Sequence, residues 1–423
     1  MNTLKKPVAN KIFKIILSFP VVIVFILVIV VNMRMYFSPE MKLIGGDTIN
    51  YDLLKELHGL KEALGNNADR DMQLLYPEGY IFFNALYGLA WCNFLKTSDN
   101  NSEYFKEGRE EIQKSLNKIN SNIGRAPFPQ EFPLPFGAFY TGWSTFLLGK
   151  KLSIEPITLR DEKEMLHFKD QCSNIASAVS DRFYPATYNG HSWPADVVLC
   201  IASLSLHDKL FAAQYTTIIH DWLKNVKKNL DPIGLIPHAV SPENGIPLEN
   251  ARGSSQSLML IFLKEIDNDF ANQQFQVYKT NFLGTRFGLP GIREYRNGDY
   301  GIGDVDSGPV LFQMGSAATI VGMQTLYIYG EYDSSIGIRN AIEAIGFAIE
   351  NDNTKIYLMG ILPLADAFIA WGHSAGSISR TIKANFTKFH FYSIVVAIIL
   401  MLALWFLWRP TLRSFERSSH TPR

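Results

Sequence analysis

The sequence has few cysteines and no net charge, and each of these shortages excludes a class of protein. Only Cys92, Cys172 and Cys200 occur in 423 residues. They are too few and too scattered for a disulfide framework or a structural zinc site. Lys plus Arg and Asp plus Glu number 40 each, which disfavours a nucleic-acid-binding protein. Hydrophobic residues form 47% of the chain, too many for a disordered protein.

Motifs for cofactors are also lacking. The chain contains no HExxH, no Walker loop and no dinucleotide-binding glycine fingerprint. His191, His238 and His373 are far apart in the sequence. We therefore expect no cofactor and no metal, unless the fold brings these histidines together. Cys92 and Cys200 fall in segments expected to be core helices, where they are small core residues or, alternatively, part of a cysteine-based dehydratase site.

Two long apolar runs are present, one near each end of the chain. Residues 15–31 are interrupted only by Ser18 and Pro20, and residues 391–408 carry no charge. Each approaches the ~20 residues that cross a bilayer. We expect transmembrane helices at 15–33 and 391–408. The first run could be a cleaved signal peptide, but its length and the lack of a small-residue cleavage site favour a retained anchor.

The charges around these runs predict a topology. Residues 1–14 contain four lysines and no acid, and residues 409–423 contain four arginines and one glutamate. The rest of the chain is net acidic. Because positive residues accumulate on the cytoplasmic side, 1–14 and 409–423 should be cytoplasmic tails. Residues 37–388 should form a domain on the other side, in the periplasm or outside the cell.

The region between the apolar runs repeats six times. Each repeat has a turn rich in Pro, Gly and aromatic residues, followed by a strongly apolar helix; the segments are 76–91, 134–149, 190–206, 251–263, 304–326 and 360–375. Amphipathic stretches lie between them, near 48–64, 103–120, 160–181, 211–229, 269–283 and 334–350. Regular spacing indicates repeated supersecondary units. Apolar helices should form an inner ring and amphipathic helices an outer one, giving a single all-α domain, an (α/α)6 toroid of six helical hairpins.

This six-hairpin pattern resembles the toroid shared by glycoside hydrolases, uronate lyases and epimerases, and terpene-processing enzymes. The membrane-anchored layout is similar to that of linalool dehydratase-isomerase-like proteins. The resemblance covers the domain at the level of architecture. It implies an (α/α)6 fold with a central cavity, and no catalytic signature accompanies it.

The turns that enter the inner helices should meet over the central cavity. Helix N-termini offer free N–H groups there, which favour anionic or oxygen-rich ligands. The turns and their neighbouring loops supply the candidate substrate-binding residues Glu78, Tyr80, Tyr140, Trp193, His238, Arg252, Gln256, Glu294 and Tyr295, together with Asp366 and His373.

The glycine-rich segment 290–309 is the strongest catalytic candidate. Asp304 and Asp306 are two residues apart, so both face the same way in an extended loop. Two close carboxylates raise one pKa, as a general acid requires. Alternatively, Asp306 or Ser307 caps the fifth inner helix and Asp304 binds a backbone turn. The spacing weakly resembles the acid motif of cationic terpene cyclases, although a serine stands where that motif has a further aspartate.

A second candidate is the segment GHSWPAD, which contains His191, Trp193 and Asp196. Pro194 suits the first turn of a helix, so Asp196 would lie in that turn. His191 and Asp196 are therefore further catalytic candidates, and Trp193 could stack on a sugar or enclose a hydrocarbon. The alternative for Asp196 is a carboxylate held only by the helix dipole.

Arg252 precedes another inner helix. It could bind a carboxylate, phosphate or sulfate, or it could pair with Asp304 or Asp306. Ser254 and Ser255, which follow it, are more simply helix caps than nucleophiles.

Three functions remain open from the sequence. The first is a hydrolase, lyase or epimerase that acts on an envelope or capsular glycan. The second is a dehydratase or isomerase of an isoprenoid or another apolar alcohol. The third is a non-catalytic, membrane-anchored binding or scaffold protein. The expected partners are the bilayer and a glycan or apolar small molecule, with no nucleic acid; protein partners are unknown.

Overall fold

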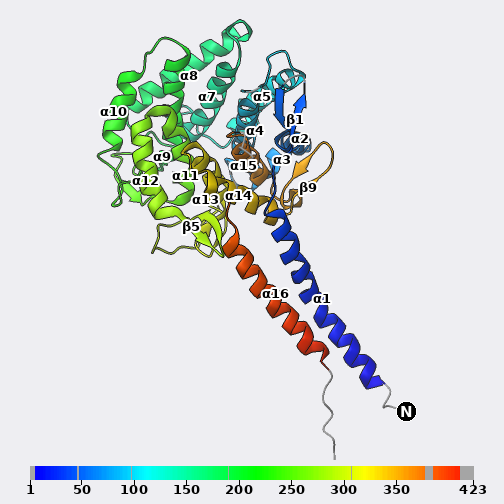
Figure 1. Cartoon of the computed structure of the whole chain (residues 1–423). Helices are drawn as coiled ribbons and strands as arrows, with labels where there is room; N and C mark the ends of the chain where they lie inside the picture. The colour runs from blue at the N-terminus through cyan, green and yellow to red at the C-terminus, as the bar shows by residue number, and fades with distance from the viewer. Residues whose placement is uncertain are drawn as a thin grey trace, which may run out of the picture.

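The computed structural model describes residues 5–44, 47–96, 98–188, 190–305, 307–376 and 384–409. These residues form a helical domain from which two long helices project (Figure 1).

An inner ring of six helices forms the centre of the described domain. The helices are α4 (Gly79–Leu95), α7 (Gly137–Ile154), α9 (Pro194–Leu210), α11 (Gly253–Ile266), α13 (Ser316–Ile328) and α15 (Pro363–His373). Each contacts the next, and α15 contacts α4, so the ring closes. Nearly every residue of α4 and α7 is buried, because these helices are covered on all sides.

An outer layer of amphipathic helices covers this ring. The helices are α2 (Tyr51–Gly65), α5 (Glu103–Ile119), α8 (Glu162–Asp181), α10 (Thr216–Val226), α12 (Asn268–Phe282) and α14 (Tyr332–Ile345). In α5, Phe105, Ile112 and Leu116 are buried, and the Ser102 hydroxyl caps the first turn by accepting from the Phe105 N–H at 3.1 Å. The predicted (α/α)6 toroid is confirmed by this closed double layer.

The connections contain shorter elements that the sequence pattern did not predict. They include the helices α3 (Ala68–Leu75) and α6 (Asn122–Arg125), and the 3-10 turns η1 (Ile157–Leu159) and η2 (Leu358–Gly360). The described residues also form five antiparallel hairpins: β1–β2 (Met41–Ile44, Asp47–Asn50), β3–β4 (Ala239–Val240, Pro247–Glu249), β5–β6 (Leu283–Arg286, Leu289–Ile292), β7–β8 (Val310–Leu311, Met314–Gly315) and β9–β10 (Ile349–Glu350, Lys355–Ile356). Strands of two to four residues are too short to show a period-2 pattern.

One of these hairpins displaces the fifth inner helix. The sequence placed this helix in segment 304–326, directly after a turn that contains Gly308, but α13 begins only at Ser316, because β7–β8 occupies the intervening residues. Gly315 is the residue before the first turn of α13, so the alternative in which Ser307 caps this helix was wrong.

The two apolar runs form α1 (Lys5–Arg34) and α16 (Thr387–Trp408). Both are long and apolar enough to cross a membrane, which is consistent with membrane anchoring. They run side by side from the same part of the domain (Figure 1). Near the domain, His390 Nδ1 lies 2.7 Å from Asn32 Oδ1; at the far end, Trp408 Nε1 donates to Ser18 Oγ at 2.8 Å. The helices therefore pair in an antiparallel arrangement.

A small separate cluster attaches this helical pair to the toroid. Met35, Ala344 and Phe386 are buried together, with Leu289 of β6 packed against them. The Asn340 side chain of α14 donates to the Met35 carbonyl at 2.8 Å. Met35 follows α1 directly and Phe386 precedes α16 directly, so one cluster fixes the domain ends of both helices.

Candidate active site

A cavity of about 190 Å³ lies where the inner helices begin. Each inner helix contributes to its wall from its first four residues, namely Phe82 (α4), Phe139 (α7), Ala195 and Asp196 (α9), Ser254 and Ser255 (α11), Ala317 (α13) and Leu364 (α15). The remaining wall residues are Tyr76, Glu78, Tyr188, Trp193, His238, Leu258, Val305, Val321 and Phe368. Six helix N-termini thus surround one cavity, and their dipoles favour negative charge within it.

Two carboxylates line this cavity among the described residues. Glu78 precedes α4, and its carboxylate accepts a hydrogen bond from the Tyr188 hydroxyl. Asp196, in the first turn of α9, is 9% exposed and accepts from the Thr187 hydroxyl at 2.9 Å. The two acids come from different repeats, so the cavity presents carboxylates from two walls.

His238 adds a neutral imidazole to the wall. Burial and then the nearby Arg252 charge lower the pKa of His238 to about 4. Its Nδ1 atom is buried and has no hydrogen-bond partner in the described part of the chain. His238 is therefore uncharged at neutral pH, and its unpartnered Nδ1 atom has almost no surface open to the cavity.

Aromatic side chains form another part of the surface. At the mouth, the Trp193 and Tyr188 rings meet edge to face, with 5.5 Å between their centroids. Deeper, Phe82 contacts Phe139 at 4.9 Å and Phe368 at 5.5 Å. The cavity thus combines a polar mouth with an apolar floor.

The predicted catalytic residues do not lie together at the cavity. Asp196 lines the cavity, whereas His191 is exposed and its ring stacks on Trp193 with 5.4 Å between centroids. His191 is therefore placed at the rim. Asp306 lies outside the described residues.

Asp304 pairs with Arg252, as one of the sequence alternatives held. Arg252 also contacts Glu249 at 2.5 Å, so it lies between two acids. Partial burial raises the pKa of Asp304, but the Ser307 N–H, at 2.9 Å, and Arg252 outweigh burial and lower it overall. An acid that stays ionised in this way does not suit the role of general acid.

Glu294 and Gln256 lie behind the cavity wall. Both have no exposed surface. Ser254 donates its N–H to Glu294 at 3.2 Å and its hydroxyl at 2.7 Å. Burial raises the pKa of Glu294 to about 7 despite these bonds. The Gln256 amide donates to the Ile236 carbonyl at 2.6 Å.

Three candidate tyrosines, Tyr80, Tyr140 and Tyr295, and Arg252 do not line this cavity. Tyr295 and Arg252 line a neighbouring pocket. The Tyr140 hydroxyl donates to Asn120 Oδ1 at 3.0 Å and lines a third pocket. Tyr80 is buried, and burial followed by the nearby Asp69 charge raises its pKa. Of the predicted site residues, Glu78, Trp193, Asp196 and His238 therefore line the cavity.

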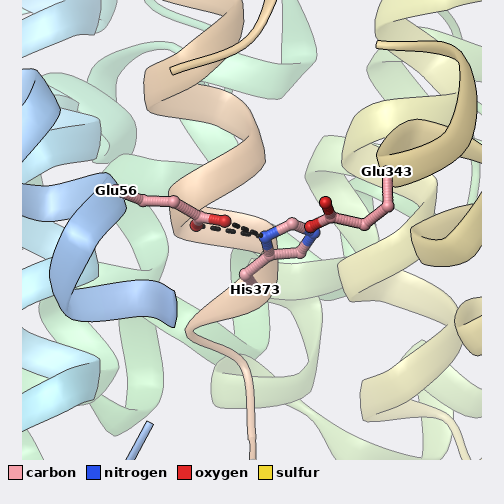
Figure 2. Close-up of side chains that lie close together, drawn as sticks. All are labelled: Glu56, Glu343 and His373. Atoms are coloured by element: carbon pink, nitrogen blue, oxygen red, sulfur yellow. Dashed lines mark hydrogen bonds and ion pairs between the residues drawn. The ribbon is translucent and has the colours of Figure 1, made fainter. Parts of the chain in front are cut away.

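A buried cluster was missed, in which Glu56, Glu343 and His373 lie close together (Figure 2). Lys355 and Tyr357 complete it. His373 Nδ1 lies 2.8 Å from Glu56 Oε1, and Lys355 Nζ donates to Glu343 at 2.8 Å. The Tyr357 hydroxyl lies within 2.8 Å of both carboxylates. Glu56, Glu343 and His373 have the donor types of a metal site. However, both acids already have partners, since Lys355 pairs with Glu343 and His373 contacts Glu56, so the arrangement is that of a buried polar network whose members bind one another.

The position of His373 differs from its expected place at the cavity mouth. It is the last residue of α15, at the opposite end from Leu364, which lines the cavity. Asp366, in the first turn of the same helix, accepts from the Tyr357 N–H at 3.0 Å, and burial raises its pKa to about 8. No sequence signal indicated the cluster, because Glu56 and Glu343 lie in amphipathic helices where acids normally face water.

The cysteines are core residues. All three are buried, and burial raises the pKa of Cys92 to about 12 and that of Cys200 well above its ordinary value. The Cys200 thiol donates to the Ala138 carbonyl at 3.4 Å. Protonated thiols of this kind do not serve as nucleophiles.

The fold and the cavity together define a six-hairpin toroid protein. No family model matches the sequence, and no curated protein matches it. Among solved structures, an α-mannanase of family GH76 from Bacteroides thetaiotaomicron is 10% identical, with a TM-score of 0.44 over 70% of this chain and 85% of that one. A family 105 glycoside hydrolase from C. acetobutylicum is 12% identical, with a TM-score of 0.43 over 69% of this chain and 92% of that one. An unsaturated glucuronyl hydrolase from a Bacillus species is 10% identical, with a TM-score of 0.42 over 88% of this chain and 99% of that one. Similarity at this level gives no information about activity.

Proposed function

We propose that the protein is a membrane-anchored extracytoplasmic enzyme that performs acid–base chemistry on an envelope or capsular glycan. The observation that supports this most is the pair of carboxylates, Glu78 and Asp196, on two walls of one aromatic-lined cavity. Hydrolysis, elimination and epimerisation of sugars all use such a pair, one group donating a proton while the other accepts one or attacks. Trp193 and Tyr188 offer ring faces and edges for a sugar at the mouth.

The size of the cavity favours a compact part of the substrate. About 190 Å³ is smaller than the ~300–1,000 Å³ of typical pockets that enclose a whole ligand. We infer that a terminal sugar unit enters, while the rest of the glycan stays outside.

The test replaces each acid without removing its bulk. Glu78→Gln and Asp196→Asn should each lower turnover by about 10²-fold or more. Mass spectrometry of envelope glycans from cells with wild-type or variant protein would show accumulated substrate. Glu110→Gln, an exposed acid on α5, is the matched control. If both cavity variants leave the glycan pool as the control does, the proposal fails.

A second function is favoured by the floor of the cavity. Phe82, Phe139, Leu258 and Phe368 make this part apolar, as a dehydratase or isomerase of an isoprenoid alcohol requires. The same variants distinguish the two functions. A change in the lipid pool with constant glycans would support the isoprenoid substrate.

The proposed topology keeps both tails in the cytoplasm and the toroid outside it. It is supported by the basic tails and by the antiparallel pairing of α1 and α16, which puts both tails at the same end. Cysteines at two positions test it with a membrane-impermeant maleimide. In cells whose outer barrier is opened, Ile157→Cys, at a position 79% exposed, should be labelled, and Ser414→Cys in the tail should not.

A further inference from the structure

The β5–β6 hairpin packs directly against the beginning of α16. The ring of Phe287, in the turn of the hairpin, is centred 6.2 Å from that of Tyr392. The next residue, Gly288, approaches α16 so closely that a Cβ atom there would collide with the backbone nitrogen of Phe389. Tyr392 is the second residue of the apolar run 391–408. The turn of the hairpin therefore lies at the level where α16 would enter a bilayer.

Two arginines of this hairpin converge on one neutral side chain. The Arg286 guanidinium donates to Gln313 Oε1 at 2.5 Å, and Arg293 donates to the same oxygen. Among the described residues, neither arginine forms an ion pair with a carboxylate. Burial and then the charge of Arg286 lower the pKa of Arg293. Two cations thus share one acceptor, an arrangement that their repulsion opposes and that a bound anion would relieve.

Arg293 is built into the hairpin and still has donors to offer. It is 9% exposed, and its guanidinium packs on Gly284 of β5, where a Cβ atom would come within 3.3 Å of Nε and of one terminal nitrogen. Gln313 is its hydrogen-bond acceptor in the described part of the chain. Its other nitrogens are not sealed in, unlike those of Arg339, which are buried without a partner. Since a guanidinium carries five N–H groups in a planar fork, Arg293 can bind the oxygens of an anion.

The turn of β7–β8 is held in a costly conformation at this site. Phe312 and Gln313 are its two central residues, and both have positive φ, of 52° and 73°. Asparagine and glycine are the usual residues at such positions. Here the turn places the Gln313 amide between two guanidinium groups and brings the Phe312 ring to 5.0 Å from that of Phe287, measured between centroids. Strain that is kept at one place is typical of a ligand site.

We propose that Arg286, Arg293 and Gln313 bind the phosphate group of an anionic phospholipid whose acyl chains lie beside α16. The inference rests on the proposed membrane anchoring of α16. Arg286 precedes Phe287 and donates to the Phe312 carbonyl at 3.0 Å, so two exposed aromatic rings adjoin the site, as is common at the level of lipid head groups. A negatively charged head group is favoured, because the two arginines bring two positive charges.

Lipid binding can be measured on the full chain in detergent by native mass spectrometry. The chain would be titrated with dioctanoyl phosphatidylglycerol or with dioctanoyl phosphatidylcholine, and we expect the anionic lipid to bind about fivefold more tightly or better. Gln313→Glu puts a carboxylate between the arginines without a change in shape. It should lower the affinity for phosphatidylglycerol about tenfold and raise the temperature of thermal unfolding. Gln273→Glu, the same change at an exposed position of α12, is the matched control.

A second variant removes positive charge. Because Arg293 is buried, the position to change is Arg286, which is only partly buried. Arg286→Gln should weaken the binding of phosphatidylglycerol about fivefold. Arg182→Gln, at an arginine whose side chain is 54% exposed, is its control and should bind the lipid as the wild type does.

The outcomes distinguish the possible ligands. Equal affinity of Gln313→Glu and wild type for phosphatidylglycerol would overturn the site, and equal affinity of the wild type for both lipids would overturn the anionic head group. Displacement of phosphatidylglycerol by an equal concentration of inorganic phosphate would overturn the lipid in favour of a soluble phosphate. These measurements use no glycan, so their failure leaves the acid–base activity intact, and the maleimide labels test the anchoring separately.

Discussion

Glu56 and His373 form a buried hydrogen-bonded pair inside the toroid, with His373 Nδ1 2.8 Å from Glu56 Oε1, although 317 residues separate them in the chain. Glu56 belongs to the first outer helix and His373 ends the last inner one. The pair therefore joins the two ends of the ring. Both side chains have at most 2% exposure.

We predict that Glu56→Gln destabilises the protein by on the order of 3 kcal/mol at neutral pH. Burial raises the pKa of Glu56, but His373 and Lys355 outweigh burial and lower it to about 2. Because the folded-state pKa lies below the unfolded value, this stabilisation is present above about pH 4.5 and is lost as the pH falls towards 2. Denaturant unfolding of the detergent-solubilised full chain at several pH values measures it. Glu62→Gln, an exposed acid on the same helix, should have no effect.

Glu294 should have the opposite pH dependence. Its pKa of about 7 lies above the unfolded value, so the folded state holds a proton that the unfolded state loses. Stability should fall as the pH rises from about 4.5 to 7, by on the order of 3 kcal/mol. Glu294→Gln should remove this loss, because the amide carries no charge at either pH. Identical slopes of unfolding free energy against pH in variant and wild type would contradict the prediction.

Tyr188 should position the Glu78 carboxylate. Tyr188→Phe removes the hydroxyl that donates to it, and we expect kcat to fall about tenfold with a smaller change in KM. Steady-state kinetics on the accumulated glycan would measure this. Tyr300→Phe, 80% exposed in a loop near the mouth, is the control. Equal kinetics for the two variants would exclude a positioning role for Tyr188.

The pairing of α1 with α16 can be tested by cross-linking. Asn32→Cys with His390→Cys should react with a short bifunctional thiol reagent and give a faster-migrating chain on a denaturing gel, because the native side chains lie 2.7 Å apart. Asn32→Cys with Met401→Cys pairs the first position with one three turns along α16 and should stay unlinked. Cross-linking of both pairs to the same extent would contradict the antiparallel register.

The helices were predictable because their signals are local. The amphipathic stretch at 103–120 corresponds closely to α5, and the apolar segment at 190–206 to α9. The start of α13 was misplaced because Gly308 resembles the turn glycines of the other repeats, while the inserted hairpin has strands of only two residues. Short strands leave no periodic signal.

The candidate site was predicted only in part. Asp196 and Trp193 lie beside a proline that fixes the start of α9, and this local signal placed them at the cavity. Asp304 had an equally suggestive position, but its side chain pairs with Arg252, 52 residues away. Sequence spacing shows which loops converge and does not show which way each side chain turns.

The sequence by itself determined the two apolar helices, the basic tails and the six alternating pairs of helices, because each depends on composition or periodicity within some twenty residues. Only the tertiary structure decided which acids face the cavity, which pair with basic groups and which are buried at the closure of the ring. These features depend on contacts between residues up to hundreds of positions apart, which arise only when the ring closes.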